Sequence, residues 1–316
     1  MKMIHRYFKE IVPAEQRQEF IANAQIIDAT SPAHWFFAES EQEEWDIADD
    51  FPQVASPWPA CWMEFQHPGI EKLGSQTRII PHTIKTGAVI FSQTIPKENR
   101  REFLASWGLA RMAGLPIHNS SLDRFKDTTR LAMARLFEPA WAQEMLVYVE
   151  SGGRFEFLFA SFSYLDENGR IDRGTNFYIP NQKMAQVPDF AAICTSATLP
   201  FLFTLSLLHC KNVHLEDVPI DPAVLRSRAK KGIPKLVFKT LVVDPLRKQA
   251  KNEADNDPSG EQNHIKRAMH IARGHFKDYR DGPGLFGKYQ GLFWWDMHVR
   301  GSSDAGTIVK NYRVKR

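Results

Sequence analysis

The sequence predicts an α+β fold, in which a mixed or antiparallel sheet with packed helices is followed by a small basic, aromatic-rich C-terminal lobe. Hairpin-like strand pairs in the middle of the chain, with helical patterns elsewhere, favour this class over a βαβ repeat. The chain has 316 residues, of which 43% are hydrophobic. This is enough apolar surface for a full core, and it excludes global disorder.

Short runs of apolar and aromatic residues, bounded by Pro, Gly, Asn or Asp, predict the strands. Two adjacent glycines at positions 152 and 153 join the clearest pair, residues 145–150 and 154–162, into a hairpin. The second of these strands alternates, which predicts one shared face for Phe155, Phe157 and Phe159. Further strands are predicted at residues 60–65, 86–92, 175–179, 235–243 and 291–299.

Helices are predicted at residues 13–25, 97–114, 120–137 and 191–209. In the third, Ser120 and Asp123 resemble a capping box, and apolar residues recur at spacings of three and four. The fourth carries no charged side chain and approaches the length of a membrane span. Its strongly apolar part is short and Pro200 lies near its centre, so we expect a buried core helix and no membrane association.

Cysteine usage and the N-terminus predict a cytoplasmic protein. The three cysteines, Cys61, Cys194 and Cys210, lack CxxC spacing, and an odd, low count is typical of a reducing compartment. The first residues contain no apolar stretch of the kind found in a signal peptide.

The uneven distribution of charged residues along the sequence predicts three parts of the chain. Residues 1–246 are predicted to form the α+β core domain, residues 247–263 a polar linker or long loop, and residues 264–316 a basic lobe packing on the core. Residues 262–316 carry an excess of seven positive charges, whereas residues 1–261 carry an excess of four negative charges. A basic end on a mildly acidic body indicates a polyanion or an acidic partner.

Residues 270–301 combine histidines, cations, glycines and aromatic side chains in a way that neither a solvated tail nor a buried core requires. Cations bind phosphates or carboxylates, and aromatic rings stack on planar groups. A strand at residues 291–299 must also bury one face, so we expect Phe293 and Trp295 to point one way and Trp294 the other. The predicted ligand-binding residues, including a second basic cluster before the linker, are His270, Arg273, Gly274, His275, Phe276, Lys277, Tyr279, Trp294, Arg300, Arg226, Arg228 and Lys230.

An enzymatic alternative uses the same segment. A metal-independent ribonuclease needs a base, an acid and a cation, and His270, His275 and His298 with nearby Arg or Lys contain these groups. We favour binding over catalysis, because composition does not establish that the histidines converge. The histidine spacings match no standard zinc site, so neither a metal nor a cofactor is predicted. The lobe serving only as a dimer contact is a third alternative, and the oligomeric state is not predicted.

The motif HIxRGHFxxY at residues 270–279 resembles the signature of a family of phage and mobile-element proteins that includes a type V-A anti-CRISPR protein. Residues 199–208 with 218–230, and residues 157–169, resemble further parts of that family. The chain departs from it by a longer stretch at residues 284–301. The positions that match the family's shared surface are His270, Arg273, Gly274, His275, Phe276 and Tyr279.

The resemblance implies a phage-encoded, non-structural protein of the bacterial host cytoplasm. Such a protein recognises a nascent polypeptide or its mRNA, on a translating ribosome, and lowers expression of the target, which in the anti-CRISPR member is the CRISPR effector nuclease. The expected partners are therefore a nascent chain, a message with its ribosome, or RNA phosphates. The sequence does not identify the target gene.

Overall fold

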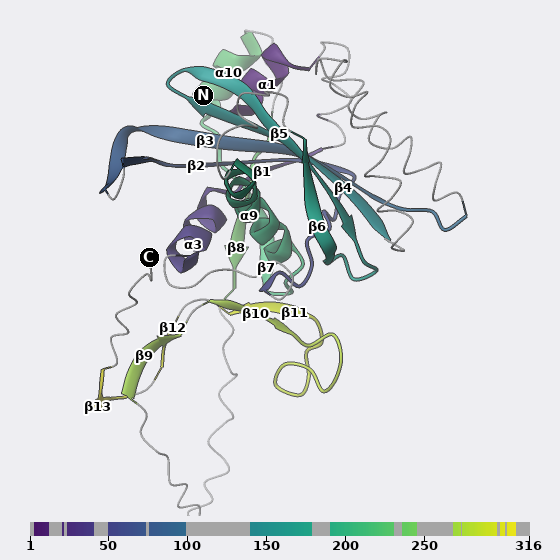
Figure 1. Cartoon of the computed structure of the whole chain (residues 1–316), viewed down its shortest axis with the longest axis vertical. Helices are drawn as coiled ribbons and strands as arrows, with labels where there is room; N and C mark the ends of the chain where they lie inside the picture. Colours follow the sequence, from purple (N-terminus) through teal and green to yellow (C-terminus); the bar gives the residue numbers. More distant parts are fainter. Residues whose placement is uncertain are drawn as a thin grey trace, which may run out of the picture.

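The computed structural model confirms the α+β class and the mixed sheet (Figure 1). It describes residues 3–12, 21, 24–40, 50–73, 76–98, 140–178, 190–230, 236–244, 268–272, 274–295, 298–300 and 302–307. The helix predicted at residues 120–137, most of those predicted at 13–25 and 97–114, and the linker at 247–263 lie outside the described residues.

Eight strands form the main sheet: β1 (Gln25–Asp28), β2 (Ala60–Leu73), β3 (Gln76–Thr94), β4 (Trp141–Ser151), β5 (Arg154–Leu165), β6 (Ile171–Tyr178), β7 (Val213–Asp217) and β8 (Lys239–Val243). Their order is β6-β5-β4-β3-β2-β1-β8-β7. Strand β1 pairs in parallel with both β2 and β8, and the other pairs are antiparallel. The predicted strands within this region are all found, although β2 and β3 are much longer than expected.

The predicted common face of the three phenylalanines in β5 is wrong. Phe159 pairs with Val147 while Phe157 pairs with the next residue, Tyr148, so Leu158 is the extra residue of a β-bulge. Because a one-residue shift moves later side chains to the opposite face, Phe155 and Phe157 pack on one side of the sheet and Phe159 on the other.

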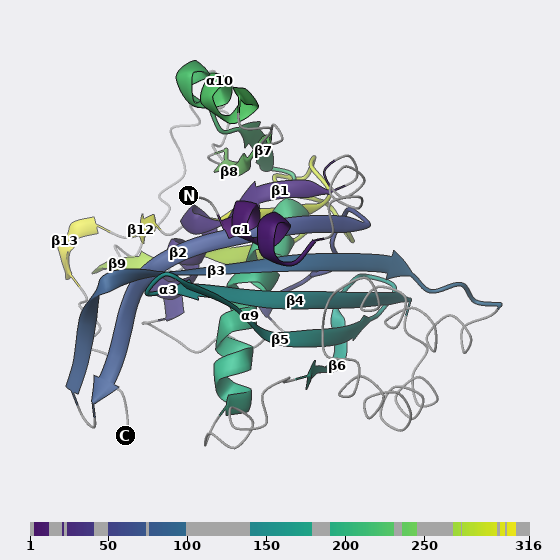
Figure 2. The same cartoon turned by 90° about the horizontal axis from the view of Figure 1, so that it is seen from above.

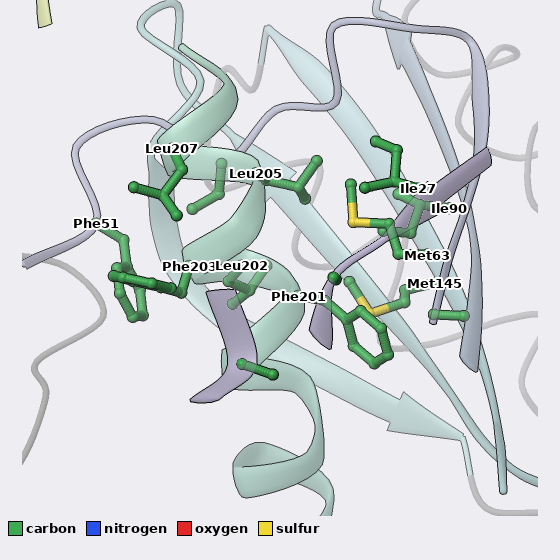
Figure 3. Close-up of a cluster of buried hydrophobic side chains, with 14 of the residues drawn as sticks. Ile27, Phe51, Met63, Ile90, Met145, Phe201, Leu202, Phe203, Leu205 and Leu207 are labelled. Carbon is green, nitrogen blue, oxygen red and sulfur yellow. The ribbon is translucent and has the colours of Figure 1, made fainter. Parts of the chain in front are cut away.

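Helices cover both faces of the sheet (Figures 1 and 2). Helix α1 (Met3–Glu10) packs on one face, where Trp62 and Tyr148 are fully buried. Helices α3 (Thr30–Ser40) and α9 (Phe190–Leu208) lie on the other face. Figure 3 shows Phe201, Leu202 and Phe203 of α9 directed into this second core.

Helix α9 is the predicted apolar helix, and its packing confirms that it is a core element. Its buried hydroxyl groups are satisfied within the fold, since Thr198 and Thr204 donate to the carbonyls four residues earlier and Ser206 donates to the carbonyl of Gln53. Among the described helices, none combines the length and hydropathy needed to cross a lipid bilayer.

The C-terminal strands are β9 (Ala268–Ala272), β10 (His275–Asp278), β11 (Leu292–Trp295), β12 (His298–Arg300) and β13 (Ser302–Thr307). Antiparallel pairing joins β10 to β11 and β9 to β12, and both ladders keep one register, from Asp278↔Leu292 to His270↔Arg300. The two ladders belong to separate sheets, a pair β10-β11 and a triplet β12-β9-β13, and both lie beyond α9 and the ends of β7 and β8 in Figure 1.

Candidate cation–aromatic binding face

The inner face of the β10–β11 hairpin is part of the core. The rings of Phe276, Trp294 and Phe203 of α9 pack together, with centroids 4.8 Å apart for Phe276–Trp294 and 5.2 Å for Phe203–Trp294. The side chain of Asn212 accepts a hydrogen bond from the backbone N–H of Trp294 at 3.0 Å and donates one to its carbonyl at 2.9 Å. An amide side chain thus binds β11 as a neighbouring strand does, which fixes the position of the hairpin.

The prediction that Trp294 contacts a ligand is therefore corrected, because its ring is only 1% exposed and lies in the core. Phe276 is partly buried, its ring packs against that core, and its contact with a ligand stays a prediction. Gly274, which precedes β10, is also buried. These residues position the hairpin from inside.

The outer face of the hairpin, defined as His275, Lys277, Tyr279, Phe293 and Trp295, has a different composition. The register places His275 opposite Trp295 and Lys277 opposite Phe293. Strand alternation puts these side chains on the face opposite Phe276 and Trp294, and Phe293 shares this face with Trp295 as the sequence predicted. On this face Phe293 is buried, at 6% exposed, whereas the other four side chains are partly exposed.

The contacts on the outer face join a cation to stacked rings. The ammonium of Lys277 lies 4.1 Å from the ring centroid of Trp295. The His275 ring stacks on the same indole at 6.4 Å with an interplanar angle of 26°, and Tyr279 packs edge-on against Phe293 at 6.2 Å. A cation held over an aromatic ring is arranged before any ligand arrives, and it suits planar or anionic groups.

A polar clamp that the sequence did not predict ties the loop end of the β10–β11 hairpin to the core. Arg280 donates from Nε to both oxygens of Asp278, at 2.9 and 3.1 Å, and from Nη1 to Gln53 at 3.2 Å. Arg170, at the β5–β6 turn, donates to Asp278 at 3.3 Å. The hydrogen bond from Arg280 lowers the pKa of Asp278. No local pattern marks these residues, because they meet only through the fold.

His209, at the end of α9, extends the clamp. Its Nε2 lies 2.6 Å from the carbonyl oxygen of Ala55, so this nitrogen carries the proton and donates. Burial lowers the pKa of His209, and the positive charge of Arg280 acts in the same direction. The native contact is therefore made by the neutral imidazole.

We expect His209 to make stability pH-dependent. A folded-state pKa below the ordinary value of 6.5 means that the stability contribution is complete above pH 6.5 and is lost as pH falls through the folded pKa. Urea unfolding of the wild type should show decreasing free energy of unfolding as pH is lowered from about 7.5 to about 5, and His209→Gln should flatten this dependence.

His214 supplies the control for that measurement. It lies between Glu216 and Asp244, and its hydrogen bond to Glu216 is the main cause of its raised pKa. Its contribution has the opposite sign, since it is present at low pH and lost as pH rises through the folded pKa. His214→Gln should therefore steepen the loss of stability on acidification. Parallel pH profiles for the wild type and His209→Gln would contradict the assignment.

The second basic cluster does not join the hairpin. Arg226 and Lys230 are exposed on helix α10 (Pro222–Lys230), which also contains Arg228. Figure 1 shows α10 at the end of the core opposite β10 and β11. The sequence suggested that the two clusters form one surface, and the structure places them apart.

The histidines of the ribonuclease alternative are distributed over the two C-terminal ladders, β10–β11 and β9–β12. His270 pairs with Arg300, and His298 pairs with Ala272, three positions before His275. Three positions of extended chain span about 10 Å, so the register keeps His275 away from His298, whereas His270 and His298 are diagonal neighbours. Arg273 lies outside the described residues. In the described part of the chain, no group of three or more His, Cys, Asp or Glu side chains is arranged to hold a metal ion.

Together, the fold and the hairpin define an α+β protein that carries a cation–aromatic face on a hairpin anchored in its core. Comparison with protein-family models, with curated proteins and with solved structures finds no match to this chain.

Proposed function

We propose that this protein is a phage-encoded regulatory binding protein of the bacterial cytoplasm, which recognises a nascent polypeptide or its mRNA and lowers expression of the target. The observation that supports a binding role is the asymmetry of the hairpin. Its inner face is committed to the core, whereas its outer face presents a lysine over an indole beside His275 and Tyr279.

The chemistry of the outer face fits the proposed ligands. A translating message offers phosphates and bases, and a nascent chain offers carboxylates, carbonyls and aromatic side chains. Lys277 supplies charge, and Trp295 with Tyr279 supplies flat apolar surface. An extended ligand lying along a strand meets these groups in succession, because side chains of one strand face recur every second residue.

The test is capture from translating cells. Tagged full-length protein is crosslinked in the bacterial host, and the co-purifying RNA and peptides are identified from the polysome fraction. We expect one message, or the N-terminal part of its product, to be enriched. Each side-chain truncation on the outer face should cost on the order of 1 kcal/mol, so Lys277→Ala with Tyr279→Ala should reduce enrichment by about tenfold or more.

A variant at Lys97, which is exposed three residues after β3, is the matched control and should behave as the wild type. The start of the enriched message is then fused to a reporter, whose expression should fall when the wild type is present and recover with the double variant. Enrichment unaffected by the double variant, or an unchanged reporter, would contradict the proposal.

A further inference from the structure

The loop at residues 280–291, between β10 and β11, carries two exposed aromatic rings. We call it the tip loop; Figure 1 shows it in yellow, beyond the ends of the two strands. Phe286 is 44% exposed and Tyr289 is 45% exposed, and only two other large hydrophobic side chains among the described residues are comparably exposed. Single exposed apolar residues are ordinary, but two rings in one short loop need a reason.

Hydrogen bonds and close backbone packing within the tip loop fix the positions of the two rings. Leu285 and Tyr289 exchange backbone hydrogen bonds of 2.7 and 3.0 Å, and the Leu285 side chain is buried. Gly284 lies so close to the Tyr289 backbone that a Cβ there would stand 2.9 Å from its carbonyl oxygen. Gln290 donates to the carbonyl of Gly282 at 3.2 Å and narrows the neck of the loop.

The backbone of Phe286 is strained. It has φ 55°, and in the described part of the chain no other non-glycine residue has positive φ. A left-handed conformation costs an L residue about 1–2 kcal/mol, a cost that glycine avoids. Gly284 and Gly287, on either side, adopt similar φ values. A bulky ring kept at the strained position, and exposed to solvent, indicates that the ring itself has a role.

Three lysines accompany the rings. The ammonium of Lys288 lies 5.1 Å from the ring centroid of Tyr289, the alkyl chain of Lys211 lies against Gly291 at the neck, and Lys277 lies on the adjoining outer face. Within the described residues none of these lysines forms an ion pair, whereas the nearby Arg170 and Arg280 both bind Asp278. The positive charges available to a ligand near the tip loop are therefore those of the three lysines.

We infer that the tip loop binds single-stranded RNA, with bases stacked on Phe286 and Tyr289 and phosphates bound by Lys288 and Lys211. Exposed rings beside unpaired cations are the combination that binds unpaired nucleotides, because every base has a flat face and every linkage a charge. A duplex keeps its base faces stacked and offers no such surface. The inference rests on the proposed function and deepens it, since it names the message as the ligand at this end of the hairpin.

The direct test uses a fluorescein-labelled 12-nucleotide oligo(U) RNA and the full-length protein, with binding followed by fluorescence anisotropy. Phe286→Ala and Tyr289→Ala should each weaken binding about 5- to 150-fold, the equivalent of one lost stacking interaction. Phe286→Trp should retain affinity and Phe286→Leu should not, because leucine is apolar but does not stack. Lys288→Ala should lower the slope of log Kd against log salt by about 0.7.

Two variants separate binding from folding. Phe286→Gly removes both the ring and the strain, so it should melt no lower than the wild type while binding weakly. Asp281→Asn removes an exposed negative charge from the loop and should tighten binding. A duplex RNA of the same length should bind more weakly than the single strand.

Several results would overturn the inference: no binding of oligo(U) by the wild type, affinity insensitive to Phe286→Ala and Tyr289→Ala, or equal affinity of the Leu and Trp variants. The last result would show that Phe286 does not bind RNA by stacking on a base. If RNA binding fails while the reporter is still repressed, only this inference falls and the nascent chain is left as the ligand. If the reporter is also unaffected, the proposed function falls with it.

Discussion

Replacing Trp294 with alanine is expected to release the C-terminal hairpin from the core. The indole is buried against Phe203 and Phe276, and truncation of a buried Trp costs about 3–5 kcal/mol. Its Nε1 has no hydrogen-bond partner among the described residues, so the loss is one of packing. Urea unfolding measures the change in free energy, and hydrogen exchange of the β10 and β11 amides reports whether the hairpin detaches first.

Trp295→Ala is the matched control, because it removes the same volume from the next residue of the strand. Trp295 lies on the outer face and is only partly buried, so its loss should destabilise the fold much less. Trp294→Phe should recover much of the lost stability by refilling part of the cavity. Equal destabilisation by Trp294→Ala and Trp295→Ala would contradict the assignment of inner and outer faces.

Replacing Glu64 with alanine is expected to destabilise the opposite side of the sheet. This carboxylate in β2 is 5% exposed and accepts hydrogen bonds from the indole Nε1 of Trp62 at 2.9 Å and from the backbone N–H of Ile4 at 3.1 Å. It also lies at the N-terminus of α1, where negative charge is favourable. Alanine leaves two buried donors unsatisfied, each at about 1–3 kcal/mol, so a total loss of about 2–5 kcal/mol is expected.

Glu64→Gln separates hydrogen bonding from charge. Glutamine keeps an acceptor oxygen in the same place, so it should lose only the part of the stability that depends on charge. Thermal melting and tryptophan fluorescence follow both variants, since the indole of Trp62 loses its acceptor only in the alanine variant. Similar losses for alanine and glutamine would show that the charge, and not the pair of hydrogen bonds, dominates.

Alternation, hydropathy and turn residues predicted the strands and the helix that depend only on neighbouring positions in the sequence. The strands around the Gly152–Gly153 turn, the apolar helix α9 and the two faces of residues 292–295 follow from alternation and hydropathy. The bulge at Leu158 does not follow from them, because nothing in an alternating run marks an extra residue. The prediction from alternation therefore assigned Phe159 to the wrong face. Short elements such as α1 and β1 carry too few residues for a period to be recognised.

The part of the candidate site that lies on one strand could be predicted, because it too depends only on alternation along that strand. His275, Lys277 and Tyr279 lie at every second position, so their common face is a local property of one strand. The clamp of Arg170, Asp278 and Arg280 joins segments more than a hundred positions apart, and no spacing encodes that contact. The distance between α10 and the hairpin is likewise set by the whole sheet, which is why the two basic clusters were wrongly combined.

The interior position of β1, between β2 and β8, has a consequence for the order of events during synthesis. This strand leaves the ribosome early, yet one of its two neighbours, β8, is made after nearly the whole of the core. At about 5–20 residues per second, one edge of β1 stays open for roughly ten seconds or more. An unpaired strand edge can pair with the wrong strand during that time. Folding during synthesis should therefore be helped by a factor that covers the free edge of β1 until β8 has been made.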